Sequence, residues 1–141
     1  MTITYEEAVR IMREAHFGQV DKCGEIYPLH PLRVSKRFKD AYKDEIATQA
    51  ALFHDLFEDT PVTETNLKEW GVEEEVIKIV NILTRKKEER YFDYIRRIKD
   101  SKNVRAIYIK IADLEDNLRP SPEGESLRQR YFKALNILVG G

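Results

Sequence analysis

The sequence predicts an all-α protein with a single domain. Apolar residues recur at helical spacing over most of the chain, and helix-capping residues stand ahead of several of these segments. No strand-length segment with strict polar–apolar alternation is bounded by hairpin turns. The 141 residues are 42% hydrophobic and 35% charged, which is typical of one globular domain that can bury a core.

The first helix is predicted over residues 4–16, where Thr4 and Glu7 form a capping box ahead of an apolar stripe. Residues 17–31 are rich in glycine and proline, which favours a loop. Residues 32–38 follow a proline, a residue common in the first turn of a helix, and predict a short helix.

Apolar positions nearly encircle the segment 44–59, a pattern typical of a helix buried at the centre of a bundle. Thr60 and Pro61 end it. Residues 107–111 alternate briefly, as in a strand, but the alanines on either side favour helix. The remaining predicted helices follow in order at 63–70, 73–84, 88–99, 104–118 (with Asn103 as N-cap), and from Ser121 to about Leu138.

Charge and composition exclude several classes of protein. With 24 basic and 25 acidic residues the net charge is −1, without the basic excess of proteins that coat nucleic acid. No apolar run reaches the roughly 18 residues of a membrane span. Cys23 is the single cysteine, so an internal disulfide is excluded, and the N-terminus lacks a secretory pattern. We expect a cytoplasmic protein without nucleic-acid or membrane partners; its oligomeric state is not predicted.

The pair His54-Asp55 falls on the apolar central helix, with Glu58 and Asp59 one turn later. Burying four ionisable groups without partners would cost several kcal/mol. A divalent metal is a suitable partner, because imidazole and carboxylate together bind manganese, iron or zinc. Alternatively, the carboxylates are solvated at a helix end and His54 is a hydrogen-bonded core residue.

A second cluster lies further along the chain, where Lys110, Asp113 and Asn117 share one face of a predicted helix. Alternatively, Asp113 pairs with Lys110 at the surface, and Glu115 and Asp116 are ordinary exposed charges. A third cluster is the loop over residues 18–31, which contains His30 just before Pro31. Taken alone, His30 is more typical of a residue at the start of a helix than of a metal ligand.

Together the three clusters resemble the hydrolase domain of RelA/SpoT-type alarmone enzymes, a branch of the HD-domain metal phosphohydrolases. The resemblance covers roughly residues 5–135. Its motifs are His-x-Gly-Gln-x-x-Lys-x-Gly-x-x-Tyr-x-x-His-Pro from His16, Ala-Leu-x-His-Asp-x-x-Glu-Asp-Thr from Ala51, and Lys-x-Ala-Asp-x-x-x-Asn-x-Arg from Lys110. It implies one HD-type helical bundle over residues 1–141, without a fused synthetase domain.

The resemblance also implies roles for particular residues. His16 is expected to be structural. The residues implied to act directly are the ligands of one Mn²⁺ (His30, His54, Asp55 and Asp113), the pair that orients and deprotonates the attacking water (Glu58 and Asp59), and the nucleotide contacts (Lys22, Asn117 and Arg119).

The implied reaction removes the 3′-pyrophosphate of ppGpp or pppGpp and leaves GDP or GTP. The chain departs from the family at Asp21, where many members carry an arginine that can stack on guanine, and at Pro120, where threonine is common. Asp21 favours a first alternative, an HD-domain hydrolase of another nucleotide such as a nucleoside monophosphate or NADPH. A second alternative is a non-catalytic nucleotide sensor or a protein-interaction module with the same fold, neither of which would need the pair Glu58 and Asp59.

Overall fold

The computed structural model describes residues 3–21, 24–119 and 124–140, and these form helices, turns and one isolated β-bridge. The prediction of an all-α fold is confirmed. No helix in this part of the chain has both the length and the hydropathy to cross a membrane. The helices are α1 (Tyr5–Ala15), α2 (Leu29–Lys36), the π-helix η1 (Arg37–Ala41), α3 (Glu45–Phe53), α4 (Leu56–Asp59), α5 (Glu64–Glu69), α6 (Glu74–Leu83), α7 (Tyr91–Asp100), α8 (Val104–Asn117) and α9 (Glu125–Val139).

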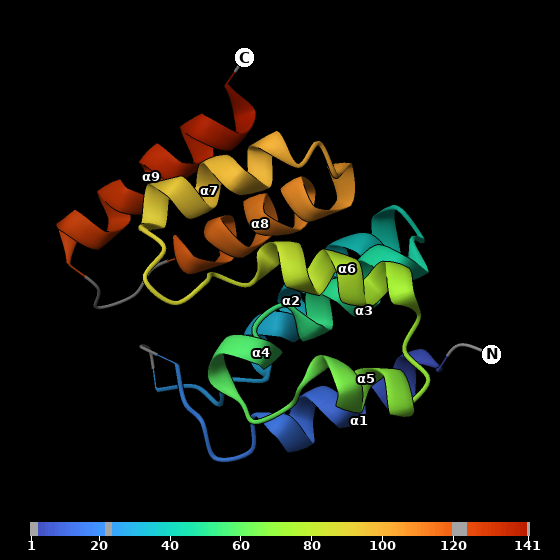
Figure 1. The fold of residues 1–141 in the computed structure, drawn as a ribbon. Helices are drawn as coiled ribbons and strands as arrows, with labels where there is room; N and C mark the ends of the chain where they lie inside the picture. The colour runs from blue at the N-terminus through green and yellow to red at the C-terminus, as the bar shows by residue number, and fades with distance from the viewer. Residues whose placement is uncertain (1–2, 22–23, 120–123, 141) are drawn as a thin grey trace.

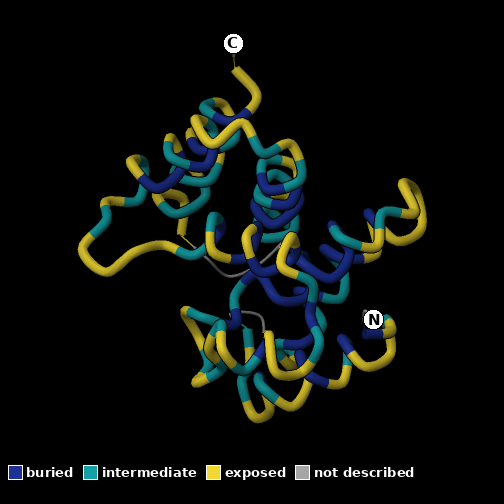
Figure 2. The backbone as a smooth tube through the Cα atoms, turned by 45° about the vertical axis from the view of Figure 1, so that its right-hand side comes forward, coloured by how far each residue is buried: buried dark blue, intermediate teal, exposed yellow. Residues whose placement is uncertain are grey.

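Helix α3 is the centre of the bundle (Figure 1) and packs against α1, α2, α6 and α8. Its seven residues from Ala47 to Phe53 are all buried, as the apolar pattern predicts. The helices α7, α8 and α9 pack on one another and form a layer on one side of the bundle. Buried residues (dark blue in Figure 2) lie within both groups of helices, including α1 and α3 on one side and α7, α8 and α9 on the other.

The predicted helix over 44–59 is interrupted, so that prediction is wrong at His54 and Asp55. Helix α3 ends at Phe53 and α4 begins at Leu56. The backbone amide of His54 bonds to the Ala51 carbonyl with an N–O distance of 3.5 Å, and the His54 Nδ1 also bonds to it at 2.6 Å. The side chain thus competes for a backbone acceptor, which ends the regular helix.

Helix α2 begins three residues earlier than predicted, so His30 lies in its first turn and not at the end of a loop. The loop before it is folded back on itself, with a bridge between Val20 and Ile26. Gly18 and Gly24 have φ angles of +85° and +82°, which glycine adopts without strain.

The capping signals are confirmed where they are local. Thr4 and Glu7 form the capping box of α1, and Asn103 accepts a hydrogen bond from the amide of Ala106 at the start of α8. Helix α9 begins at Glu125, later than the sequence predicts. Ser121, which was predicted to start that helix, lies outside the described residues.

Asp44 anchors the central helix. Its side chain accepts a hydrogen bond from the Ala47 amide at 3.0 Å and pairs with Arg105 at 2.8 Å. Burial alone would raise the pKa of Asp44, but these two interactions lower it overall. Since the lowered pKa favours the charged, folded form, the stabilisation is present at neutral pH and is lost as pH falls below about 4.

We therefore expect Asp44→Ala to lower the free energy of unfolding by about 1 kcal/mol at pH 7, the usual value of an N-cap. Urea denaturation at pH 7 and pH 3 measures this, with the exposed Asp40→Ala as control. The difference from wild type should shrink at pH 3. An equal loss at both pH values would contradict the assignment.

Candidate metal centre and its cleft

Four side chains from distant parts of the chain converge on one point. His30 comes from α2, Asp113 from α8, and His54 and Asp55 from the break between α3 and α4. One donor atom of each lies within 4.8 Å of the donor atoms of the other three. The structure thus brings together the four residues that the resemblance implies as ligands.

Asp113 lies at the middle of this cluster. Its Oδ1 is 2.7 Å from Nε2 of His30 and 3.2 Å from Nε2 of His54. Nε2 of His54 is also 3.2 Å from Oδ2 of Asp55. His30, His54 and Asp113 are each no more than 5% exposed, so their donor atoms face one another away from bulk water.

The Nδ1 atom of each imidazole already makes a hydrogen bond within the protein. Nδ1 of His54 donates to the Ala51 carbonyl, and Nδ1 of His30 donates to Asp116 at 2.7 Å. In the neutral form both Nε2 atoms then carry lone pairs that point at carboxylates, an arrangement that a cation between them satisfies. Two imidazole nitrogens and two carboxylates are a donor set suited to a first-row divalent metal, so the residues fit such an ion.

The pKa shifts of His30 and Asp113 agree with a site that attracts a cation. Burial alone would lower the pKa of His30, but its hydrogen bonds to Asp113 and Asp116 raise the pKa to about 9. Burial would raise the pKa of Asp113, whereas Lys110 and His54 hold it well below its usual value. The carboxylates therefore attract positive charge to the histidines. The same four residues would hold a divalent ion, which would supply that positive charge in place of the protons.

Asp116 holds the His30 imidazole in place through a hydrogen bond to Nδ1. Besides His30, it binds Arg33 in a bidentate pair, with Nε–Oδ1 at 2.8 Å and Nη2–Oδ2 at 3.0 Å. The alternative that Asp116 is an ordinary exposed charge is wrong, since its side chain is 12% exposed. The signal that points to it is its spacing three residues after Asp113, which puts both on one helix face.

Three residues of the first motif hold the segment with Asp55 and Asp59 in place. The Tyr27 hydroxyl donates to Asp55, and burial raises the pKa of Tyr27, which keeps the hydroxyl protonated. Nδ1 of the buried His16 bonds to Oε1 of Gln19 at 2.9 Å, and the Gln19 amide nitrogen donates to the backbone oxygen of Asp59 at 3.0 Å. These contacts agree with a structural role for His16.

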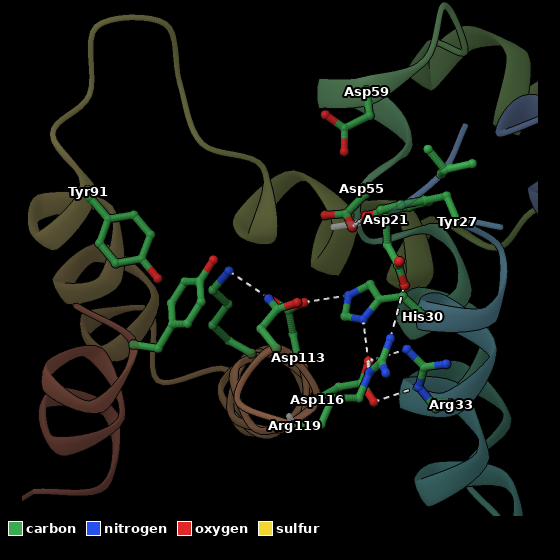
Figure 3. Close-up of a pocket in the computed structure, with 14 residues that line it drawn as sticks. Asp21, Tyr27, His30, Arg33, Asp55, Asp59, Tyr91, Asp113, Asp116 and Arg119 are labelled. Atoms are coloured by element: carbon green, nitrogen blue, oxygen red, sulfur yellow. Dashed lines mark hydrogen bonds and ion pairs between the residues drawn. The ribbon is translucent and has the colours of Figure 1, made fainter. Parts of the chain in front are cut away.

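Glu58 and Asp59 lie at the exposed end of α4, but they face different groups. Asp59 lines a cleft that opens beside the four clustered residues, and Figure 3 shows its carboxylate above Asp55. Glu58 accepts a hydrogen bond from the backbone amide of Arg85. Partial desolvation, with the nearby charge of Asp55, raises the pKa of both carboxylates.

The cleft has a volume of about 450 Å³, and Asn117 and Arg119 are among the residues that line it. The Arg119 guanidinium is 2.9 Å from a carboxylate oxygen of Asp21 and 3.1 Å from one of Glu25. Asp21, the residue that departs from the family pattern, thus offsets the charge of a residue predicted to contact the nucleotide. Lys22, also predicted to do so, lies outside the described residues, as do Cys23 and Pro120.

Lys110 lies in the same cleft, with its ammonium nitrogen 2.8 Å from Oδ2 of Asp113. Its side chain is 12% exposed, so the alternative of a surface ion pair is wrong. Burial would lower the pKa of Lys110, but Asp113 raises it well above its usual value, and the lysine stays charged.

No protein-family model matches the chain. A guanosine-3′,5′-bis(diphosphate) 3′-pyrophosphohydrolase of Haemophilus influenzae is 35% identical over 117 residues, which cover 77% of this chain and 17% of that protein. The bifunctional (p)ppGpp synthase/hydrolase SpoT of Escherichia coli is 32% identical over 121 residues, or 80% and 17%. A solved structure of a metazoan SpoT ortholog, described as hydrolysing ppGpp, has a TM-score of 0.80 at 26% identity and covers 99% of this chain and 89% of that chain.

Over most of its length the chain is similar to RelA/SpoT-type (p)ppGpp hydrolases. It spans 17% of the length of each of the two curated relatives. His54 and Asp55 lie at the interruption between α3 and α4, close to Asp113 and His30.

Asp116→Asn should weaken the binding of a divalent metal by about 10- to 100-fold, because the His30 imidazole loses its charged partner. Calorimetric titration of Mn²⁺ into the metal-free protein measures the change. The matched control is Glu115→Gln, one position earlier, whose carboxylate pairs with Arg37 at the surface. Affinity within twofold of wild type for Asp116→Asn would show that His30 needs no such support.

Proposed function

We propose that this chain hydrolyses guanosine alarmones, removing the 3′-pyrophosphate of ppGpp or pppGpp to leave GDP or GTP. The observation that carries the proposal is the cluster of His30, His54, Asp55 and Asp113 beside a cleft whose size suits a nucleotide. The names of the relatives support the same substrate. We further propose that residues 1–141 act as one hydrolase domain in the cytoplasm.

We propose Mn²⁺ as the ion that these four residues hold. A bound divalent ion acidifies a water molecule from a pKa of 15.7 toward about 7 and offsets phosphate charge. Asp116 and the Ala51 carbonyl keep each Nε2 directed at the site through their bonds to Nδ1. Tyr27 holds Asp55 in the same way.

Asp59 is the proposed proton acceptor, because it lines the cleft while Glu58 is bound to the Arg85 amide. A raised pKa makes a carboxylate a stronger base near neutral pH, which suits general-base catalysis. Glu58 is proposed to orient the water and to fix the end of α4. Lys22, Asn117 and Arg119 are proposed to contact the nucleotide.

A second candidate is a hydrolase of the same chemistry with another phosphorylated nucleotide as substrate. The ion pair between Asp21 and Arg119 favours it, since it reduces the positive charge available to a substrate with two diphosphate groups.

The test is an assay of the purified chain with Mn²⁺ and ppGpp, with products separated by anion exchange. We expect GDP and pyrophosphate in equal amounts. Turnover of a nucleoside monophosphate or NADPH without turnover of ppGpp would establish the second candidate instead. Metal binding without turnover of any of these nucleotides would indicate a sensor.

A further inference from the structure

The Tyr91 hydroxyl in the cleft has no hydrogen-bond partner among the described residues. Tyr91 begins α7 and lines the cleft, yet its hydroxyl is buried and makes no hydrogen bond within residues 3–21, 24–119 and 124–140. An unpaired buried hydroxyl destabilises a folded protein, and such groups are rare. Tyr94, one turn later, shows the usual arrangement, since its hydroxyl donates to the Leu83 carbonyl at 2.6 Å.

Two guanidinium groups lie near the Tyr91 ring. The guanidinium carbon of Arg130 lies 3.7 Å from the centre of the Tyr91 ring, and that of Arg85 lies 5.6 Å from it. Burial raises the pKa of Tyr91, and the Lys110 ammonium opposes this rise. The raised pKa keeps the hydroxyl protonated at neutral pH, so it is a hydrogen-bond donor.

The position of Tyr91 indicates what it can donate to. Figure 3 shows Tyr91 on the side of the cleft away from His30 and Asp55, with its hydroxyl directed inward. Lys110 lines the same cleft and has three N–H donors, one of which bonds to Asp113, while the ammonium also contacts Tyr94. The Tyr91 hydroxyl and the Lys110 ammonium therefore lie around one space, opposite the four clustered side chains. Such an uncharged donor and a cationic donor together suit an anion with several oxygen acceptors.

We propose that the Tyr91 hydroxyl and the Lys110 ammonium donate hydrogen bonds to oxygens of a diphosphate group bound in this cleft. The inference rests on the proposed function, in which the diphosphate is the group released when its bond to the 3′-oxygen breaks. Tyr91 then contributes to binding and selects for a diphosphate ester. The Arg130 guanidinium, stacked on the ring, holds it in position.

The variant Tyr91→Phe tests this because it removes only the hydroxyl. Inorganic pyrophosphate is titrated into the Mn²⁺-loaded protein by calorimetry, and we expect the dissociation constant to rise about tenfold or more, the usual effect of one hydrogen bond to a charged group. The thermal midpoint should be unchanged or higher, since an unpaired hydroxyl is removed. The matched control is Tyr108→Phe, at an exposed tyrosine of α8, which should leave the thermal midpoint unchanged and the pyrophosphate affinity within twofold of wild type.

Equal pyrophosphate affinity in wild type and Tyr91→Phe would overturn the inference, as would absence of pyrophosphate binding to wild type. Hydrolysis of ppGpp by wild type is measured in parallel and reports on the proposed function by itself. If wild type does not hydrolyse ppGpp but Tyr91→Phe still weakens pyrophosphate binding tenfold, the subsite stands and the proposed substrate is wrong.

Discussion

Asp113→Asn should reduce the proposed ppGpp hydrolysis by about 10³-fold or more and abolish Mn²⁺ binding. The Asp113 carboxylate contacts both histidines and Lys110, so its replacement disrupts the whole cluster. Metal ions supply several kcal/mol of transition-state stabilisation, and each 1.4 kcal/mol is about tenfold in rate. Turnover is measured together with the molar ratio of bound manganese.

The control for Asp113→Asn is Asp93→Asn, an exposed aspartate on α7. Because Asp113→Asn leaves the buried Lys110 without its anionic partner, the variant can also lose stability. His54→Ala is therefore tested beside it, since it leaves the Asp113–Lys110 pair in place. Either variant with wild-type turnover would contradict the ligand assignment.

Asp59→Asn should lower kcat by about 10²- to 10⁴-fold without loss of Mn²⁺ binding, because the proposed proton acceptor is lost and the four proposed metal ligands are unchanged. A carboxylate base must be ionised to act, so wild-type activity should rise as pH rises through the pKa of Asp59, which is higher than usual. That acidic limb should be absent in Asp59→Asn. A pH profile of kcat/KM for both proteins measures it.

Glu58→Gln is the informative comparison, and we expect a smaller loss than for Asp59→Asn because Glu58 is bound to the Arg85 amide. Glu69→Gln, at the exposed end of α5, is the control for general effects of charge. A larger loss in Glu58→Gln than in Asp59→Asn would reverse the two roles.

The parts of the fold that depend on local sequence were predictable. The capping box of Thr4 and Glu7 and the N-cap Asn103 each satisfy a backbone donor within three residues, so the sequence carries the whole interaction. The interruption after Phe53 was not predictable. It depends on the orientation of the His54 ring, whose Nδ1 bonds to the Ala51 carbonyl. The apolar pattern of residues 44–59 does not indicate it.

The family resemblance, and not helical spacing, predicted that His30, His54, Asp55 and Asp113 lie together. Helical spacing alone placed Lys110, Asp113 and Asn117 on one face but could not bring them to His30. The role of Asp116 depends on His30 and Arg33, which are separated from it by more than 80 residues in sequence. The unpaired hydroxyl of Tyr91 is a property of tertiary packing, so no sequence pattern indicates it.

Anomalous diffraction from crystals grown with Mn²⁺, recorded at the manganese absorption edge, tests the central claim most directly. We expect one strong peak within bonding distance of Nε2 of His30, Nε2 of His54, Oδ2 of Asp55 and Oδ1 of Asp113. Manganese bound elsewhere, or a site that omits Asp113, would contradict the account.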